Sequence, residues 1–146
     1  MNIAMAADHG GYELKNILRD YLTEKGHTVL DLGTNSESSV DYPDYAALCC
    51  NKVVSGEADF GILVCGTGVG ISIAANKIKK IRCGLCPTPE IAALVKQHNN
   101  ANVIALGGRF TDSIVAKKIV DSYMAAEFEG GRHQGRIDKI TAIENC

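Results

Sequence analysis

The chain has 146 residues, the length of a single domain, so we expect residues 1–146 to form one folded unit that needs no cross-links to be stable. Its 15 basic and 17 acidic side chains give a formal net charge of −2, which argues against a nucleic-acid or membrane-surface partner. With 46% hydrophobic and 22% charged residues and no run of 18 apolar residues, neither a disordered chain nor a membrane span is expected.

The first third of the chain predicts a strand, a helix, a second strand and a second helix. Residues 2–7 predict a short buried strand, preceded by no basic, signal-like start. Apolar residues then recur at helical spacing from Leu14 to Leu22, and Gly26 ends that helix. Residues 28–32 predict the second strand, and a polar loop leads to a helix from Pro43 to about Val54.

The rest of the chain continues the same alternation. Three more strands are predicted, at residues 60–64, 82–86 and 103–106. Helices are predicted over residues 71–77, 89–97 and 111–128, and in the tail beyond Gly130. The third of these helices is expected to be capped by Thr111 or Asp112.

This alternation predicts an α/β fold, doubly wound as a three-layer α/β/α sandwich with a five-stranded parallel sheet, Rossmann-like in arrangement. Ligands of such sheets bind beyond the carboxyl ends of the strands. Polar residues beside strand ends are therefore the candidate site residues. They are Asp8 and His9 after the first strand, Cys65 to Gly70 after the third, and His98 before and Arg109 after the fifth.

The segment Cys65 to Gly70 is the most distinctive of these. Gly66, Gly68 and Gly70 allow backbone N–H groups to converge on an anion at a helix N-terminus. The spacing does not match a dinucleotide fingerprint or a P-loop, and Ile71 stands where a cysteine phosphatase would need arginine. The alternative is a tight strand–helix turn that binds no ligand.

The cysteines divide into one candidate and several structural residues. Cys65 precedes the predicted helix, where a thiolate is favoured and could be a nucleophile or a general base; otherwise it is a buried structural cysteine. Cys83 and Cys86 form a C-x-x-C on a predicted strand without a second pair, so we expect neither a metal site nor redox chemistry there. In the cytoplasmic location that we expect, the cysteines stay reduced.

Histidines and arginines supply further candidates. His9 and His98 could act as acid, base or phosphate ligand near neutral pH, whereas His133 is expected on the surface of the tail. Arg132 and Arg136 are four residues apart and would share a helix face. They could clamp a phosphate, and their place in the tail suggests that they reach a neighbouring subunit; the alternative is an ordinary solvated face.

Taken together, these motifs resemble the type B ribose-5-phosphate isomerases, a family that also holds allose-6-phosphate and galactose-6-phosphate isomerases. The matching segments span essentially the whole chain: Asp8–Gly11, Val40–Tyr45, Cys65–Ser72, Ala74–Lys77, His98–Asn102 and Gly107–Arg109. The resemblance implies interconversion of ribose 5-phosphate and ribulose 5-phosphate through a cis-enediolate, with no metal and no cofactor.

The resemblance also implies a role for each matching residue. Cys65 would be the base that moves a proton between C1 and C2, and Thr67 the assisting hydroxyl. The amides of Gly66, Gly68 and Gly70 would hold the enediolate, and His98, with Asp8 nearby, would open the sugar ring. Contacts to the sugar or its phosphate are implied for Tyr42, Asn99, His9, Arg109, Arg132 and Arg136. Some relatives place a glutamate at position 71; here Ile71 indicates the cysteine-base subgroup.

In this family the site lies between two subunits. The resemblance therefore implies a homodimer or homotetramer in which His98 and some arginines come from the partner and residues 130–146 pack on it. The preferred sugar, ribose, allose or galactose, stays open. So do two other functions: a thiol-dependent phosphohydrolase or redox protein, and a non-catalytic sugar-phosphate-binding subunit that needs a sister chain, as in two-subunit galactose-6-phosphate isomerases.

Overall fold

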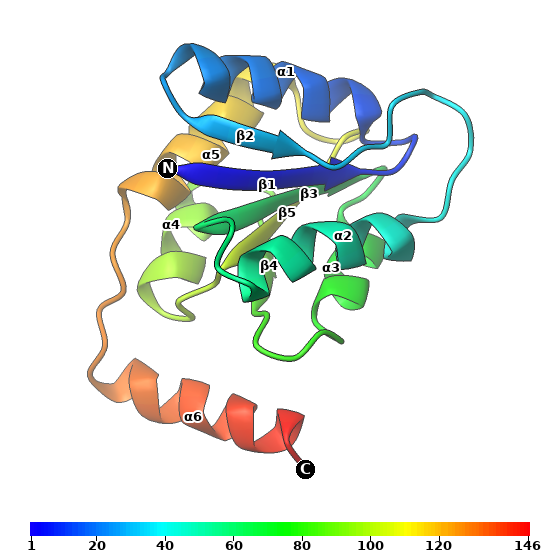
Figure 1. The fold of residues 1–146 in the computed structure, drawn as a ribbon. Helices are drawn as coiled ribbons and strands as arrows, with labels where there is room; N and C mark the ends of the chain where they lie inside the picture. Colours follow the sequence, from blue (N-terminus) through cyan, green and yellow to red (C-terminus); the bar gives the residue numbers. More distant parts are fainter.

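The apolar runs of the sequence form one parallel sheet with the strand order β2-β1-β3-β5-β4 (Figure 1). A computed structural model describes all of residues 1–146. The strands are β1 (Asn2–Ala7), β2 (Thr28–Asp31), β3 (Phe60–Cys65), β4 (Cys83–Leu85) and β5 (Val103–Gly107). The predicted five-stranded parallel sheet is confirmed.

Helices cover both faces of this sheet. They are α1 (Tyr12–Glu24), α2 (Tyr42–Val54), α3 (Val69–Ala75), α4 (Pro89–Gln97), α5 (Ser113–Ala125) and α6 (Arg132–Glu144). Successive strand residues point to opposite faces, so Ile3 and Met5 pack with α1, α4 and α5, whereas Ala4 and Ala6 pack with α2 and α3. The result is the predicted three-layer sandwich. No helix is long and apolar enough to cross a lipid bilayer.

Helix α5 is shorter than the predicted 111–128. The Asp112 carboxylate accepts the N–H of Val115 at 2.9 Å, so Asp112 is the cap and the helix begins at Ser113. The backbone becomes extended at Ala126. The N–H of Glu129 then donates to the carbonyl of Gln97 at 3.0 Å, a tertiary contact that the local sequence does not encode.

Helix α3 begins two residues before the predicted 71–77 and ends two residues earlier. Gly68 has a φ of 79°, a left-handed conformation that glycine adopts without strain, and the helix starts directly after it. At the other end the Asn76 side chain donates to the Cys83 carbonyl at 3.0 Å and accepts the Cys83 N–H at 2.8 Å. This pairing ends the helix and ties it to the start of β4.

Helix α6 stands apart from the three layers (Figure 1). It is buried at His133 and Ile137 only, and near its end Glu144 accepts the N–H of Lys80 at 3.1 Å. A cavity of about 520 Å³ lies between this helix and the edge of the sheet at β4, lined in part by Ile140 and Ile143. The predicted tail helix is therefore confirmed, and most of its surface is left exposed.

A charged network at the end of β2 was not predicted. Lys15 is fully buried on α1, and its ammonium lies 2.7 Å from the carboxylate of Asp31, which Arg19 also reaches at 3.0 Å. Burial raises the pKa of Asp31, but hydrogen bonds from Lys15, the Gly33 N–H and Arg19 outweigh it, and the net pKa is lowered. The network holds the turn after β2 in place.

Candidate functional site

Three glycine-containing loops meet at the carboxyl ends of β1, β3 and β5. A Cβ added at Gly108 would lie 2.6 Å from the carbonyl oxygen of Gly10, and one at Gly10 would lie 3.0 Å from the Gly66 nitrogen. Side chains at these positions would therefore push the loops apart. Because glycines allow this approach, residues from three distant parts of the sequence share one edge of the sheet.

Cys65 ends β3 and is 5% exposed. Its Sγ atom accepts the N–H of Gly68 at 3.2 Å, a donor that the left-handed conformation of Gly68 turns toward the sulfur. The neighbouring Thr67 is exposed, and its hydroxyl oxygen accepts the N–H of Val69 at 3.1 Å. The hydroxyl hydrogen of Thr67 remains available for a ligand.

The loop after Cys65 offers further hydrogen-bond donors. The N–H groups of Gly66, Thr67 and Gly70 donate to no acceptor within the protein, whereas those of Gly68 and Val69 do. Unpaired amides at the start of a helix form a site suited to an anionic oxygen. The N–H groups of Gly66 and Gly70 are therefore free to bind the anion that the sequence predicts, while the N–H of Gly68 is directed at the thiol.

The other predicted residues of this edge surround the loop. The buried Asp8 carboxylate accepts the Gly11 N–H at 3.1 Å, and His9 Nδ1 accepts the Val40 N–H at 3.2 Å. The neutral His9 ring therefore carries its hydrogen on Nε2. Hollows of about 500 and 600 Å³ adjoin His9, the first lined also by Arg109 and the second by Asp8 and Tyr42.

Two of these side chains lie close to glycines of the loop. A Cβ at Gly70 would lie 2.7 Å from Cζ of Tyr42, and a Cβ at Gly66 would lie 2.9 Å from a guanidinium nitrogen of Arg109. The tyrosine ring and the guanidinium thus rest on the loop that carries the unpaired amides. We call this group the carboxyl-edge cluster: Asp8, His9, Tyr42, Cys65, Thr67 and Arg109.

His98 and Asn99 lie at the amino-terminal ends of the strands, the opposite end of the sheet from Cys65. Helix α4 runs back from the end of β4, so His98, at its C-terminus, precedes β5, whereas Cys65 is paired with Gly107 at the far end of β5. The five residues of β5 amount to about 16 Å of strand. Within a single chain, His98 and Cys65 are therefore separated by about the length of β5.

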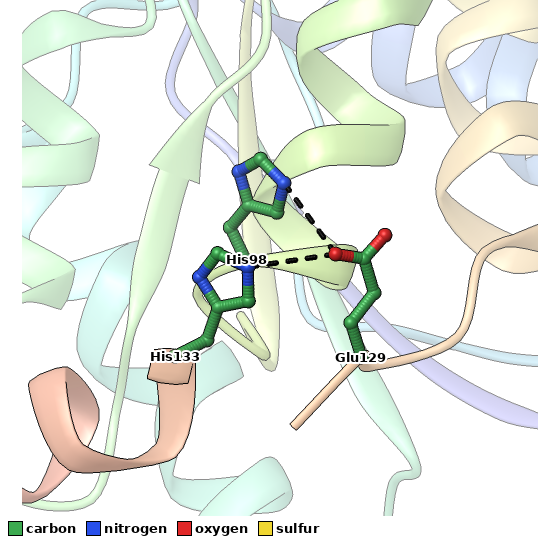
Figure 2. Close-up of side chains that lie close together, drawn as sticks. All are labelled: His98, Glu129 and His133. Atoms are coloured by element: carbon green, nitrogen blue, oxygen red, sulfur yellow. Dashed lines mark ion pairs between the residues drawn. The ribbon is translucent and has the colours of Figure 1, made fainter. Parts of the chain in front are cut away.

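At that end of the sheet His98 lies beside Glu129 and His133, which no sequence motif indicated as site residues. Its Nε2 lies 3.7 Å from Oε1 of Glu129, and Nε2 of His133 lies 3.5 Å from the same oxygen (Figure 2). The two rings stack with centroids 4.3 Å apart. The expectation that His133 lies on the surface is wrong, because the stacking buries it. The only indication of this cluster in the sequence is that Glu129 and His133 are four residues apart.

Arg132 and Arg136 flank His133 on α6. Both are exposed and form no ion pair or hydrogen bond within the chain, so their guanidinium groups are free for an external anion. We call the residues of this edge and of the adjoining helix the amino-edge cluster: His98, Asn99, Glu129, Arg132, His133 and Arg136.

The remaining buried thiols are poor candidates for chemistry. Burial raises the pKa of Cys50 and of Cys86 to about 12, and it raises the pKa values of Cys49 and Cys83 as well. All six cysteines are free. Cys83 lies in β4 as expected, whereas Cys86 directly follows this strand, which ends one residue before the predicted limit. The C-x-x-C pair still forms no disulfide, which supports its structural interpretation.

Known proteins match this chain over nearly its whole length. Residues 3–140 match the model of a family described as Ribose/Galactose Isomerase. The chain is 51% identical over 142 residues to the ribose-5-phosphate isomerase B of Escherichia coli K12, covering 97% of this chain and 95% of that protein.

Solved structures agree with this match. The structure of Clostridium thermocellum ribose-5-phosphate isomerase B matches with a TM-score of 0.98 and 48% identity, covering 99% of this chain and 98% of that one. The Mycoplasma genitalium ribose-5-phosphate isomerase B, solved with bound ribulose-5-phosphate, matches with a TM-score of 0.93 and 48% identity, covering 99% and 96%.

Proposed function

This chain belongs to the ribose/galactose isomerase family, and from that premise we propose that it interconverts ribose 5-phosphate and ribulose 5-phosphate. The family and the isomerase class predicted from the motifs are confirmed. The choice of substrate is supported by the name of the Escherichia coli relative and by the ribulose-5-phosphate bound to the Mycoplasma genitalium protein.

The observation that carries the proposal is the Cys65 thiol beside three unpaired amides. Aldose–ketose isomerisation needs a base that removes a weakly acidic C–H proton, together with donors that stabilise the negative oxygen that results. The sulfur of Cys65 supplies the base, and the N–H groups of Gly66, Thr67 and Gly70 supply the donors. No cofactor is required for this chemistry.

The proposed isomerisation consists of three proton transfers. The Cys65 thiolate removes the C2 proton of the open-chain aldose, and the electron pair moves to the C1 oxygen to give a cis-enediolate held by the loop amides. The proton on O2 passes to O1 with help from the Thr67 hydroxyl, and the Cys65 thiol returns its proton to C1. C1 is thereby reduced and C2 oxidised, with no net change in electrons. His98 and Asp8 serve the preceding ring opening.

A complete site requires two copies of the chain. The carboxyl-edge cluster holds the base and the anion site, whereas His98 and the free arginines lie at the other edge, about 16 Å of strand away. We therefore propose a homodimer or homotetramer in which residues 130–146 reach the partner's carboxyl-edge cluster. Exposed apolar side chains adjoining the glycine loop and α4 support such an interface: Leu48, Val69, Ile73, Leu85, Ile91 and Leu94.

The direct test is to assay the purified single chain with ribose 5-phosphate, allose 6-phosphate and galactose 6-phosphate, following ketose formation and phosphate release separately. We expect ketose from ribose 5-phosphate and no released phosphate. Faster turnover of a six-carbon substrate would overturn the substrate assignment. Phosphate release would favour the phosphohydrolase, and no reaction with any sugar would favour a non-catalytic subunit.

A further inference from the structure

Two histidines and a carboxylate converge at the amino edge from three separate segments. His98 ends α4, Glu129 lies in the linker before α6, and His133 is in the first turn of α6 (Figure 2). One ligand atom of each residue lies within 4.8 Å of those of the other two. Both imidazole Nε2 atoms face the same carboxylate oxygen, at 3.7 and 3.5 Å.

Backbone hydrogen bonds hold this arrangement in place. The N–H of Glu129 donates to the Gln97 carbonyl at 3.0 Å, which fixes the linker beside the end of α4. The N–H of His98 donates to the Leu94 carbonyl at 2.8 Å, and that of His133 donates to Gly130 at 3.0 Å. The backbone of all three residues is therefore held by the fold, and binding of an ion requires rotation of the side chains only.

Two imidazoles and one carboxylate form a ligand set that suits a zinc-type ion and leaves a fourth position open. In a tetrahedral site with bonds of about 2.0 Å, neighbouring ligand atoms lie about 3.3 Å apart. The observed contacts to Glu129 exceed this only slightly. The rings, 13° from parallel, must turn until their lone pairs converge, and the His98 side chain, 40% exposed, is free to do so.

We propose that His98, Glu129 and His133 bind a divalent transition metal ion of the zinc class, and that the bound ion inhibits the enzyme. The inhibition rests on the proposed function, because a metal on Nε2 of His98 would block the proton transfer that opens the sugar ring. It would also hold α6, and with it Arg132, in one position. The proposed isomerisation itself uses no metal, so the ion is an inhibitor and not a cofactor.

Metal binding is tested on the full chain with cobalt(II), whose visible absorption reports its ligands, and with zinc by calorimetry. The exposed Cys146 is first changed to serine so that its thiol does not compete. We expect one ion per chain and no thiolate–cobalt charge-transfer band. Glu129→Gln should weaken binding by at least about tenfold. Glu127→Gln, an exposed neighbour in the same linker, is the matched control and should change nothing.

The inhibition is tested by adding zinc to the isomerase assay and then removing it with a chelator. We expect reversible inhibition whose zinc dependence shifts in Glu129→Gln by the same factor as binding, and does not shift in Glu127→Gln. No binding, or binding that is equally tight in Glu129→Gln, would overturn the site. Binding without inhibition would overturn the inhibitory role. A chain that binds cobalt at Glu129 but isomerises no sugar would keep the site and refute only the proposed function.

Discussion

The carboxyl-edge and amino-edge clusters are built in opposite ways. The first rests on backbone packed against backbone: a Cβ at Gly11 would lie 2.3 Å from the Val64 carbonyl oxygen. The second rests on side chains at the end of α4, in a linker and on α6, where a Cβ at Gly135 would meet nothing within 4 Å. The Cys65 thiol and the unpaired loop amides are thus held in a closely packed frame, while Arg132 and Arg136 are exposed, in reach of another molecule.

This difference indicates a division of labour. Stabilising a short-lived negative oxygen requires donors that do not reorganise, which closely packed loops provide. Under the proposed function, recognition of a phosphate group and assembly with a partner require exposed charge, which Arg132 and Arg136 would provide. This division can be tested by substitution, alkylation and subunit exchange.

Cys65→Ala should lower the turnover of ribose 5-phosphate by about 10²–10⁴, the usual contribution of a general base. The Michaelis constant should change little, because the phosphate-binding groups are intact. Steady-state kinetics measure both, with Cys50→Ala, which removes a core thiol of α2, as the control for loss of a thiol. Near-normal turnover in the alanine variant would make Cys65 a structural residue.

Native-state alkylation should separate the core thiols from the tail thiol. With pKa values of about 12, Cys50 and Cys86 hold about a thousandfold less thiolate at pH 8 than a thiol of pKa near 9. We expect the exposed Cys146 to be modified at least about 10³-fold faster than these two, as peptide mass spectrometry would measure. Comparable rates would mean that the core opens readily in the native protein.

Subunit mixing tests whether the two clusters serve one site from different chains. Cys65→Ala and Arg136→Ala chains should each be nearly inactive. After exchange, half of the dimers contain one chain of each kind, and one site in each mixed dimer has both native residues. We expect about a quarter of wild-type activity per site. If activity stays absent although native mass spectrometry shows mixed dimers, the site is built within one chain.

The same substitution in the two regions should have opposite effects on stability. Gly11→Ala places a methyl group against backbone and should cost about 1–3 kcal/mol of unfolding free energy. Gly135→Ala, in the open interior of α6, should gain up to about 1 kcal/mol through helix propensity. Urea denaturation measures both. No gain at Gly135 would indicate that α6 unfolds separately from the sandwich.

Much of the fold could be predicted because its signals are local. The apolar run at residues 2–7 is a strand with the predicted limits, and Pro89 begins a helix as its fixed φ favours. Predictions failed where a tertiary contact overrides propensity. Helix α5 ends at Ala125 because the linker that follows bonds to Gln97, and α3 ends where Asn76 pairs with Cys83.

The site divides in the same manner. Motifs at the ends of β1 and β3 identified Asp8, His9, Cys65 and the glycine loop, because the carboxyl ends of parallel strands necessarily share one edge. The buried ion pair of Lys15 with Asp31 had no such signal. The spacing of apolar residues along α1 does not show which polar residue of the helix is buried.

By itself the sequence determined the strand–helix alternation, the family and the loop that places amides beside Cys65, because these depend on periodicity and on short motifs. Only the tertiary structure decided that His98 lies a strand length away from Cys65 and that Glu129 and His133 join it. The physical reason is the path of the chain: α4 runs against the strands and the linker folds back over its end, so residues some 30 positions apart in sequence become neighbours.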